Sequence, residues 1–419
     1  MKNKIKSVSE VFNFFKKLDT YKNNKIFIYT DKSNALDAAK ICDQRIHQIS
    51  KIDGKLFAIK PNIRVKSFPF TGGIRDFQDT ISNIDDAIIE MIKTNGGIII
   101  GSTNMDEAAF GGDTSSSYCG RCINPINEDF TVGGSSGGSA AAISSGLVDY
   151  SLGTDTMGSI RIPASYCGIV GFKPSQFIFN NKNLKLLSHT YDTIGFMSNN
   201  TNYINNLYEL YGKDHKNFKD YIKTNKNIKC LIPKEIFEDK LDEDVLTGFN
   251  YIISELKKYK INIQIKSLQY WKPDVHRKYL LKIVENEGAL TLKTLLENER
   301  SNISKNLRNS LIYGKNIEPL TLKNIKKELK ELKNKVKALF ESYDLIIMPT
   351  TPQRAFEIKK DVPKNQANFT SLANICDLPS ISLPYYYKGK LPYSLQLLAP
   401  NMNDHFLLRI SSYFEEILQ

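Results

Sequence analysis

The stretch from Gly101 to Val170 constrains this chain most, because small residues dominate it and only Arg121 and Arg161 are basic. A segment with few long side chains lets the backbone approach a ligand closely. Its densest part, residues 133–142, reads GGSSGGSAAA, in which glycines permit tight turns and alanines favour a helix that begins directly afterwards. Because a helix N-terminus attracts negative charge, we expect a phosphate or oxyanion site here, with a flexible serine-capped turn as the alternative.

A second loop of the same character, residues 153–163, contains Ser159, 24 residues after Ser135. A lone serine is a weak nucleophile at neutral pH and needs a base within hydrogen-bond reach. No histidine lies nearby in the sequence, so we expect a lysine whose pKa is lowered by burial. Lys60 and Lys173 both follow apolar residues, so either could be a buried lysine of this kind. Their distances along the sequence from the two serine loops do not choose between them. An ordinary surface lysine is the alternative for each.

The composition predicts a soluble globular protein. Hydrophobic residues make up 41% of the 419 residues and charged residues 24%, which excludes disorder as the main state. No run of about 20 apolar residues could span a bilayer, so we expect no membrane association. We place the protein in the cytoplasm, with the mitochondrial matrix as the alternative because the first 18 residues are basic and weakly import-like.

The cysteines and histidines are too dispersed for a metal site. Six scattered cysteines favour a reducing compartment over a disulfide framework. Cys119 and Cys122 form the only close pair, and without a second pair they are expected to be loop thiols rather than zinc ligands. We therefore expect no metal and no cofactor.

Hydrophobic periodicity predicts an α/β protein. An apolar helical face over residues 84–92, capped by Ser82 or Asn83 and ended by Gly96-Gly97, precedes a short strand at 98–100. Helical patterns then predominate from about residue 200. We expect an N-terminal helical extension and a single domain, divided as follows: extension 1–24, domain 25–419, core 50–200, peripheral helical layer about 200–342, and returning strands 343–400.

The second part of the chain carries most of the net charge of +12. Residues 201–419 hold 35 basic and 26 acidic side chains. Many of the lysines lie between Lys323 and Lys337, where apolar residues recur at steps of three and four. We expect an amphipathic helix with a solvated basic face there, in preference to an RNA-binding surface, because glutamates rather than aromatic residues alternate with the lysines.

Taken together, these segments resemble the amidase signature family. The two Gly/Ser loops and the run around Lys60 carry the resemblance, and further segments support it: residues 101–107 (GSTNMDE), 167–174 (CGIVGFKP), 192–195 (DTIG) and 348–352 (MPTTP). The resemblance covers about residues 25–419. It implies an α/β/α sandwich in which helices cover both faces of a mixed central sheet.

The resemblance also implies the roles of the site residues. Ser159 is expected to be the nucleophile, Ser135 a bridging serine at a cis peptide bond, and Lys60 the base. The implied oxyanion hole consists of backbone N–H groups, those of Thr156, Met157, Gly158 and Ser159, and the residues expected to hold the loop in shape are Asp155 and Arg161. Two residues depart from the family pattern: Met157 replaces a small residue and Pro61 an aspartate.

A competing interpretation comes from residues 134–138, which also match Gly-x-Ser-x-Gly, the nucleophile elbow of α/β-hydrolases. Ser136 would then be the nucleophile, and Asp404 with His405 would complete a triad. This interpretation leaves the loop at 153–163 unexplained. Replacing His405 by alanine would distinguish the two schemes.

Within the family we expect a stand-alone amidase that cleaves a small carboxamide or urea-derived amide. Its expected partners are this small-molecule substrate and a second copy of the chain in a homodimer. The first alternative is the glutamine-hydrolysing subunit of a glutamyl-tRNA(Gln) amidotransferase, which works with tRNA-linked partner subunits. That subunit usually carries an acidic glutamine-binding residue, but residues 365–370 (NQANFT) contain none. The second alternative is a catalytically impaired scaffold. Expected pocket residues are Tyr118, Phe196, Trp271 and Tyr313.

Overall fold

The computed structural model describes residues 6–179, 181–211, 228–385 and 391–418. Their strands form one mixed sheet in the order β1-β3-β2-β4-β6-β5-β10-β11-β9-β7-β8. The strands are β1 (Phe27–Thr30), β2 (Leu56–Ile59), β3 (Ile98–Thr103), β4 (Tyr150–Asp155), β5 (Val170–Lys173), β6 (Thr193–Ser198), β7 (Lys229–Pro233), β8 (Asn262–Lys266), β9 (Leu345–Pro349), β10 (Ser380–Tyr385) and β11 (Tyr393–Leu398). Strand β2 pairs in parallel with β3 and β4, whereas β4 pairs antiparallel with β6.

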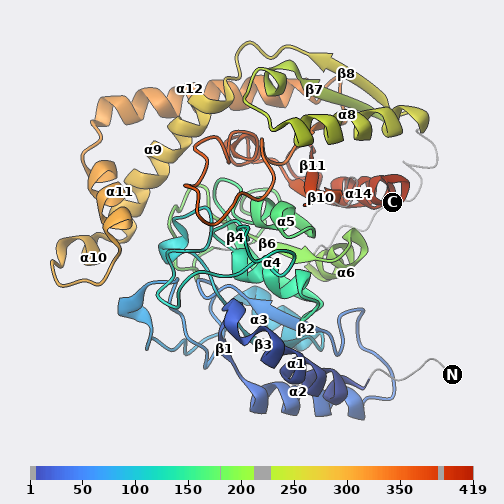
Figure 1. The fold of residues 1–419 in the computed structure, drawn as a ribbon, viewed down its shortest axis with the longest axis vertical. Coiled ribbons are helices and arrows are strands. Elements are labelled where there is room, and N and C mark those ends of the chain that lie inside the picture. Colours follow the sequence, from blue (N-terminus) through green and yellow to red (C-terminus); the bar gives the residue numbers. More distant parts are fainter. Residues whose placement is uncertain (1–5, 180, 212–227, 386–390, 419) are drawn as a thin grey trace.

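Helices cover both faces of this sheet, which confirms the predicted fold class. They are α1 (Ser7–Leu18), α2 (Lys32–Gln44), α3 (Ala87–Thr94), α4 (Gly137–Ser144), α5 (Arg161–Tyr166), α6 (Thr201–Tyr211), α8 (Glu243–Lys258), α9 (Pro273–Thr291), α10 (Lys293–Glu297), α11 (Lys305–Lys315), α12 (Pro319–Leu339), α13 (Ser371–Ile375) and α14 (Asp404–Leu418). In Figure 1, α1 and α2 lie at one end of the molecule, and β7, β8, α8 and α12 lie at the opposite end. No helix in the described ranges is long and apolar enough to cross a bilayer.

Strand β2 shows why the sheet is buried on both faces. All four of its residues are apolar and buried, and successive side chains point to opposite faces. Leu56 and Ala58 pack in one core cluster with α1, α2 and α4, while Phe57 and Ile59 pack in the other with α3. Lys60 directly follows this strand, so its position is set by packing on both sides.

Helix α3 begins later than the sequence predicts. It starts at Ala87, and its cap is the side chain of Asp86, which accepts a hydrogen bond from the backbone N–H of Ile88. The predicted caps Ser82 and Asn83 were wrong because the chain turns at these residues before the helix begins. The following strand was predicted correctly and forms β3.

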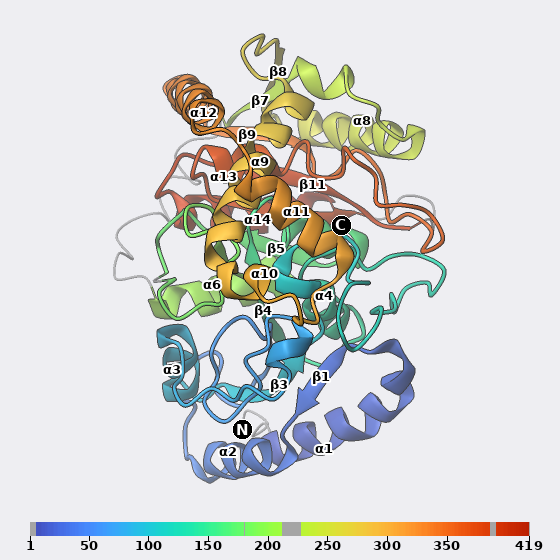
Figure 2. The same ribbon diagram turned by 90° about the vertical axis from the view of Figure 1, so that its left-hand side faces the viewer.

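The segment predicted as a helical layer also contains two strands. Strands β7 and β8 pair in parallel and extend the sheet beyond β9, which lies next to β7. Strand β8 is short and mostly exposed, and although its residues NIQIK alternate between polar and apolar, the surrounding helical patterns led to the prediction of a helical layer. Figure 2 shows α9 and α11 in front of the sheet.

The predicted amphipathic helix is confirmed as α12. Its buried side chains recur at the expected spacing and face the core: Ile325, Leu329, Leu332 and Val336. Most lysines of this helix occupy its exposed face, whereas Lys333 is partly buried and pairs with Asp377. All six cysteines are free thiols, so the close pair at 119 and 122 forms no disulfide.

Candidate active site

The first Gly/Ser loop ends in a helix, as predicted. Helix α4 begins at Gly137, and its residues 137–143 are all buried, because small side chains allow close packing against the sheet. Ser135 lies immediately before it, follows a cis peptide bond with Gly134, and is fully buried. A Cβ atom at Gly134 would collide with Oδ2 of Asp106, so no larger residue fits there.

Lys60 is the lysine that lies beside this loop. Its Nζ donates hydrogen bonds to Oγ of Ser135 at 2.8 Å and to Oγ1 of Thr154 at 3.0 Å, and its side chain is 0% exposed. Lys173 is equally buried, but its Nζ donates to the backbone oxygen of Pro174. The structure therefore brings Lys60, and not Lys173, into contact with the serine loops.

Burial changes the proton affinity of Lys60. Removal of water from the ammonium lowers the pKa of Lys60 to about 7, although buried carboxylates act in the opposite direction. The carboxylates are those of Asp192, Asp106 and Asp155. At neutral pH a large fraction of Lys60 is therefore uncharged, which is the form that can accept a proton.

The second loop is held in shape by Asp155, at the end of β4. Its Oδ1 accepts a hydrogen bond from the backbone N–H of Gly158 at 2.8 Å, and its Oδ2 accepts one from Ile160 at 3.2 Å. These two bonds lie on either side of Ser159 and fix the turn that presents it. Of the four N–H groups predicted for the oxyanion hole, that of Gly158 therefore already has a partner in Asp155.

Arg161 completes this support. Its guanidinium donates two hydrogen bonds to Asp155, at 3.0 and 2.8 Å, and both side chains are 0% exposed. Burial alone would raise the pKa of Asp155, but the charge of Arg161 lowers it to about 2. The remaining bonds of the guanidinium reach distant parts of the chain, at the backbone oxygen of Thr370, Oδ1 of Asn374 and Oε1 of Gln396.

Met157 fits the second loop without backbone strain. Its φ angle lies outside the left-handed region, whereas that of Gly158 is +128°. The backbone oxygen of Met157 accepts a hydrogen bond from Oγ1 of Thr370 at 2.6 Å. A Cβ atom at Gly158 would collide with the same Oγ1, so this turn requires glycine at 158.

The two loops meet directly. The backbone N–H of Ser136 donates to the backbone oxygen of Ser159 at 3.3 Å. Ser159 is 9% exposed and lines a cavity of about 510 Å³, whereas Ser135 is buried beneath it. The cavity wall also includes Gly134 and the second-loop residues Thr156 and Met157. The geometry therefore presents one serine to a ligand and keeps the other next to Lys60.

Two contributors to the site were not predicted. Thr154 is the second partner of Lys60, and it also accepts a hydrogen bond from Asn62 at 3.0 Å. Asp192 accepts a hydrogen bond from Oγ1 of Thr156 at 2.6 Å and thereby tethers the second loop to the segment before β6. Its place in the DTIG segment was the available sequence signal.

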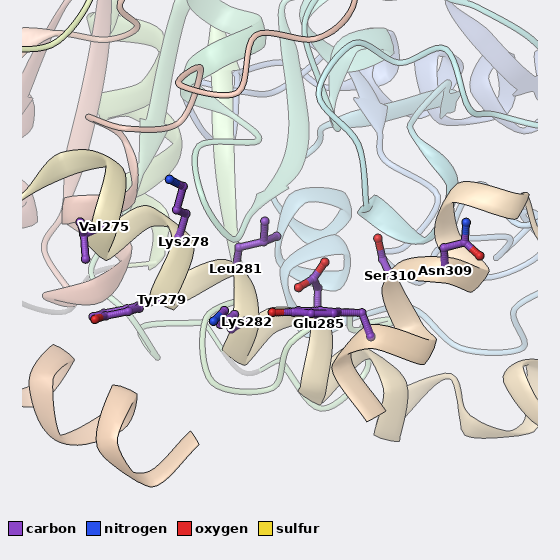
Figure 3. Close-up of a pocket in the computed structure, with 9 residues that line it drawn as sticks. Val275, Lys278, Tyr279, Leu281, Lys282, Glu285, Asn309 and Ser310 are labelled. Atoms are coloured by element: carbon purple, nitrogen blue, oxygen red, sulfur yellow. The ribbon is translucent and has the colours of Figure 1, made fainter. Parts of the chain in front are cut away.

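The aromatic residues predicted to line the pocket do not line the Ser159 cavity. Phe196 and Trp271 are core residues, with exposures of 1% and 0%. Tyr118 is absent from the cavity wall, and Tyr313 lines a second cavity of about 530 Å³ between α9 and α11 (Figure 3). Lys278 and Leu281 line both cavities, and Figure 3 shows them projecting from the same side of α9.

The nucleophile-elbow interpretation was wrong. The Oγ of Ser136 donates to the backbone oxygen of Thr154 at 3.2 Å. Asp404 accepts hydrogen bonds from Ser175, and the His405 ring packs against Tyr208 with centroids 4.9 Å apart. These groups therefore do not form a triad with Ser136.

The chain is similar along most of its length to several known proteins. A glutamyl-tRNA(Gln) amidotransferase subunit of Staphylococcus epidermidis is 29% identical, over 93% of this chain and 89% of the relative. The protein of the same name from Sulfurisphaera tokodaii is 30% identical, over 88% and 85%. The solved structure of the corresponding glutamyl-tRNA(Gln) amidotransferase subunit from Thermotoga maritima superposes with a TM-score of 0.81 at 25% identity, covering 98% of this chain and 91% of that one.

A solved amidase structure shares the fold with a TM-score of 0.90, covering 99% of this chain and 96% of that one at 21% identity. The family described as amidase matches residues 10–408, nearly the whole chain. With these matches and the buried lysine and serine loops, the chain belongs to the amidase family of hydrolases, which cleave carbon–nitrogen bonds other than peptide bonds.

Proposed function

We propose that the protein hydrolyses the side-chain amide of glutamine through an acyl-enzyme on Ser159 and releases ammonia, as the glutamine-hydrolysing subunit of a glutamyl-tRNA(Gln) amidotransferase. The observation that carries this proposal is the 2.8 Å hydrogen bond between Lys60 and Ser135, buried beneath a cavity that exposes Ser159. A neutral lysine next to a serine supplies the base that a serine nucleophile otherwise lacks.

In the proposed reaction, neutral Lys60 takes a proton from Ser135, which takes one from Ser159, and Oγ of Ser159 attacks the amide carbon. The carbon–nitrogen bond then breaks, the same relay returns a proton to the departing nitrogen, and ammonia leaves. An ester to Ser159 remains. Water attacks this ester with the relay again acting as base, which frees the carboxylic acid and restores the enzyme.

The negative oxygen of the tetrahedral intermediate is stabilised by backbone N–H groups of Thr156, Met157 and Ser159 in this proposal. Gly158 is left out because its N–H donates to Asp155. Loss of one oxyanion donor typically raises the barrier by about 2.7–4 kcal/mol. Asp155 and Arg161 act on the reaction indirectly, since they hold the turn that carries these donors.

Sequence relatives support glutamine over the small carboxamide expected from sequence. The amidotransferase subunits match along most of their own length, and the chain spans 85–94% of those of S. epidermidis, S. tokodaii and Endomicrobium trichonymphae. The stand-alone amidase is the second candidate. The observation that favours it is the composition of the pocket wall. Residues 365–370 (NQANFT), two of which line the pocket, include no acidic side chain that could bind the ammonium group of glutamine.

Labelling with a fluorophosphonate followed by mass mapping tests the chemistry. We expect an adduct on Ser159 in the wild type, none in Ser159→Ala and sharply less in Lys60→Ala. Ser136→Ala is the matched control, because this neighbouring buried serine lies outside the proposed relay and should leave the adduct unchanged. A folded wild-type protein without any adduct would refute the proposal and favour the catalytically impaired scaffold.

Ammonia release then separates the two candidate functions. An amidotransferase component should release ammonia from glutamine faster when its partner subunits and glutamyl-tRNA are present. A stand-alone amidase should hydrolyse simple amides at full rate as the isolated chain. Activity that is indifferent to partners and tRNA would therefore select the second candidate, while leaving the roles of Lys60, Ser135 and Ser159 intact.

A further inference from the structure

The cavity that exposes Ser159 is cationic on one side. Arg277 and Lys278 of α9 line it, together with Lys364 from the loop before α13. Its wall, as far as the described residues form it, contains no aspartate or glutamate. A cavity walled by one sign of charge attracts ligands of the opposite sign.

Arg277 is the most enclosed of the three cations, with 8% exposure. Its Nε donates to Oδ1 of Asn368 at 2.8 Å and its Nη2 donates to Oδ1 of Asp274 at 3.0 Å, so the guanidinium is held in one orientation. A guanidinium carries five N–H donors in a planar fork, and these two bonds use only two of them. The remaining donors suit a carboxylate, which Arg binds in a bidentate manner.

The charges near Arg277 do not cancel. Lys278 donates to the same acid, Asp274, at 2.5 Å. Lys364 has no ion-pair partner in the described part of the chain. Asp274 therefore pairs with two of the three cations, and the carboxylate of Asp239 lies one residue further away, where it accepts a hydrogen bond from Asn368 at 2.6 Å. The three cations and no acid line the described wall of the cavity that contains Ser159.

We propose that this cationic wall selects amides that carry a carboxylate, with Arg277 as the specificity-determining residue, and that the site does not recognise the α-ammonium group of an amino acid. The inference rests on the proposed function, because it concerns the substrate of the same serine. The described wall of the cavity offers no carboxylate that could pair with an ammonium. A monoamide of a dicarboxylic acid, such as glutaramate, therefore binds at least as well as glutamine.

Protection of Ser159 from fluorophosphonate labelling measures this selectivity without requiring turnover. Three probes of equal length are compared: glutaramate with a carboxylate, glutaramide without charge, and 5-aminopentanamide with an ammonium. Because hydrogen bonds to charged groups discriminate by about tenfold or more, glutaramate should protect at least about tenfold better than glutaramide. 5-Aminopentanamide should protect least, and glutamine no better than glutaramate.

Arg277→Gln should reduce protection by glutaramate to the level of glutaramide, and Arg277→Lys should restore part of it. Protection by glutaramide should stay unchanged in both variants, which shows that the site remains folded. Lys364→Gln provides a second variant with a smaller loss in the same direction. Lys282→Gln is the matched control, because this lysine of α9 lines the second cavity and not that of Ser159.

The outcomes separate this inference from the function on which it rests. If the wild type takes no adduct, the proposed function itself fails. If Ser159 is labelled but glutaramate and glutaramide protect equally, the carboxylate selectivity is refuted and the hydrolytic function stands. Protection by glutamine more than tenfold better than by glutaramate would show that the site does recognise the ammonium group.

Discussion

The pH dependence of activity tests the central role of Lys60. Only the neutral amine can accept a proton, so activity requires the deprotonated form. With a pKa of about 7, roughly 9% of Lys60 is neutral at pH 6 and roughly 91% at pH 8. We therefore expect kcat/KM to rise about tenfold between pH 6 and pH 8 and then to level off.

An unburied lysine predicts a different profile. With a pKa near the ordinary lysine value of 10.5, only about 0.3% of the amine would be neutral at pH 8, and the rate would still increase about tenfold per pH unit at pH 9. Initial rates of ammonia release from about pH 5.5 to 9.5, in buffers of constant ionic strength, distinguish the two cases. A profile that is still rising at pH 9 would refute the assignment of Lys60 as a buried base.

Two variants separate Lys60 from other groups that titrate. Lys60→Arg keeps a cation that does not lose its proton in this range, so it should be inactive at every pH. Lys173→Met removes another buried lysine, whose pKa burial lowers to about 8, but which donates to Pro174 rather than to a serine. This control should lower stability and leave the midpoint of the activity profile unchanged.

Three further substitutions test the support of the site and the core. Gly158→Ala should reduce kcat/KM at least about a hundredfold, because the turn has a positive φ at this residue and the new Cβ meets Thr370. The circular dichroism spectrum of the variant should remain native. Near-normal activity would contradict this prediction. Asp155→Asn leaves the buried charge of Arg161 uncompensated and should lower the free energy of unfolding, measured in urea, by about 3–5 kcal/mol. A decrease of less than about 1 kcal/mol would show that the ion pair is dispensable for stability. Trp271→Ala should lower the free energy of unfolding by about 3–5 kcal/mol because the side chain is 0% exposed, while native protein should still be labelled at Ser159.

Local patterns in the sequence were sufficient for much of the fold. The glycine-to-alanine transition at 133–142 predicted the start of α4, and the apolar spacing at steps of three and four predicted α12. Continuous apolar runs predicted β3 and β9. These signals are readable because helix and strand periodicities are properties of neighbouring residues. Strand β8 escaped prediction although its residues NIQIK alternate, because five residues are a short signal within a segment dominated by helical patterns.

The sequence by itself identified the family and the two serine loops. Spacing alone left Lys60 and Lys173 open as the base, and the family resemblance selected Lys60. Only the tertiary structure shows the contact itself, in which Lys60 donates to Ser135 across 75 positions of sequence. It also showed that Asp155 occupies the N–H of Gly158, and that α9 supplies the cationic wall of the cavity. The physical reason is the same in each case: chain topology brings distant groups within hydrogen-bond distance, and spacing along one segment carries no information about them.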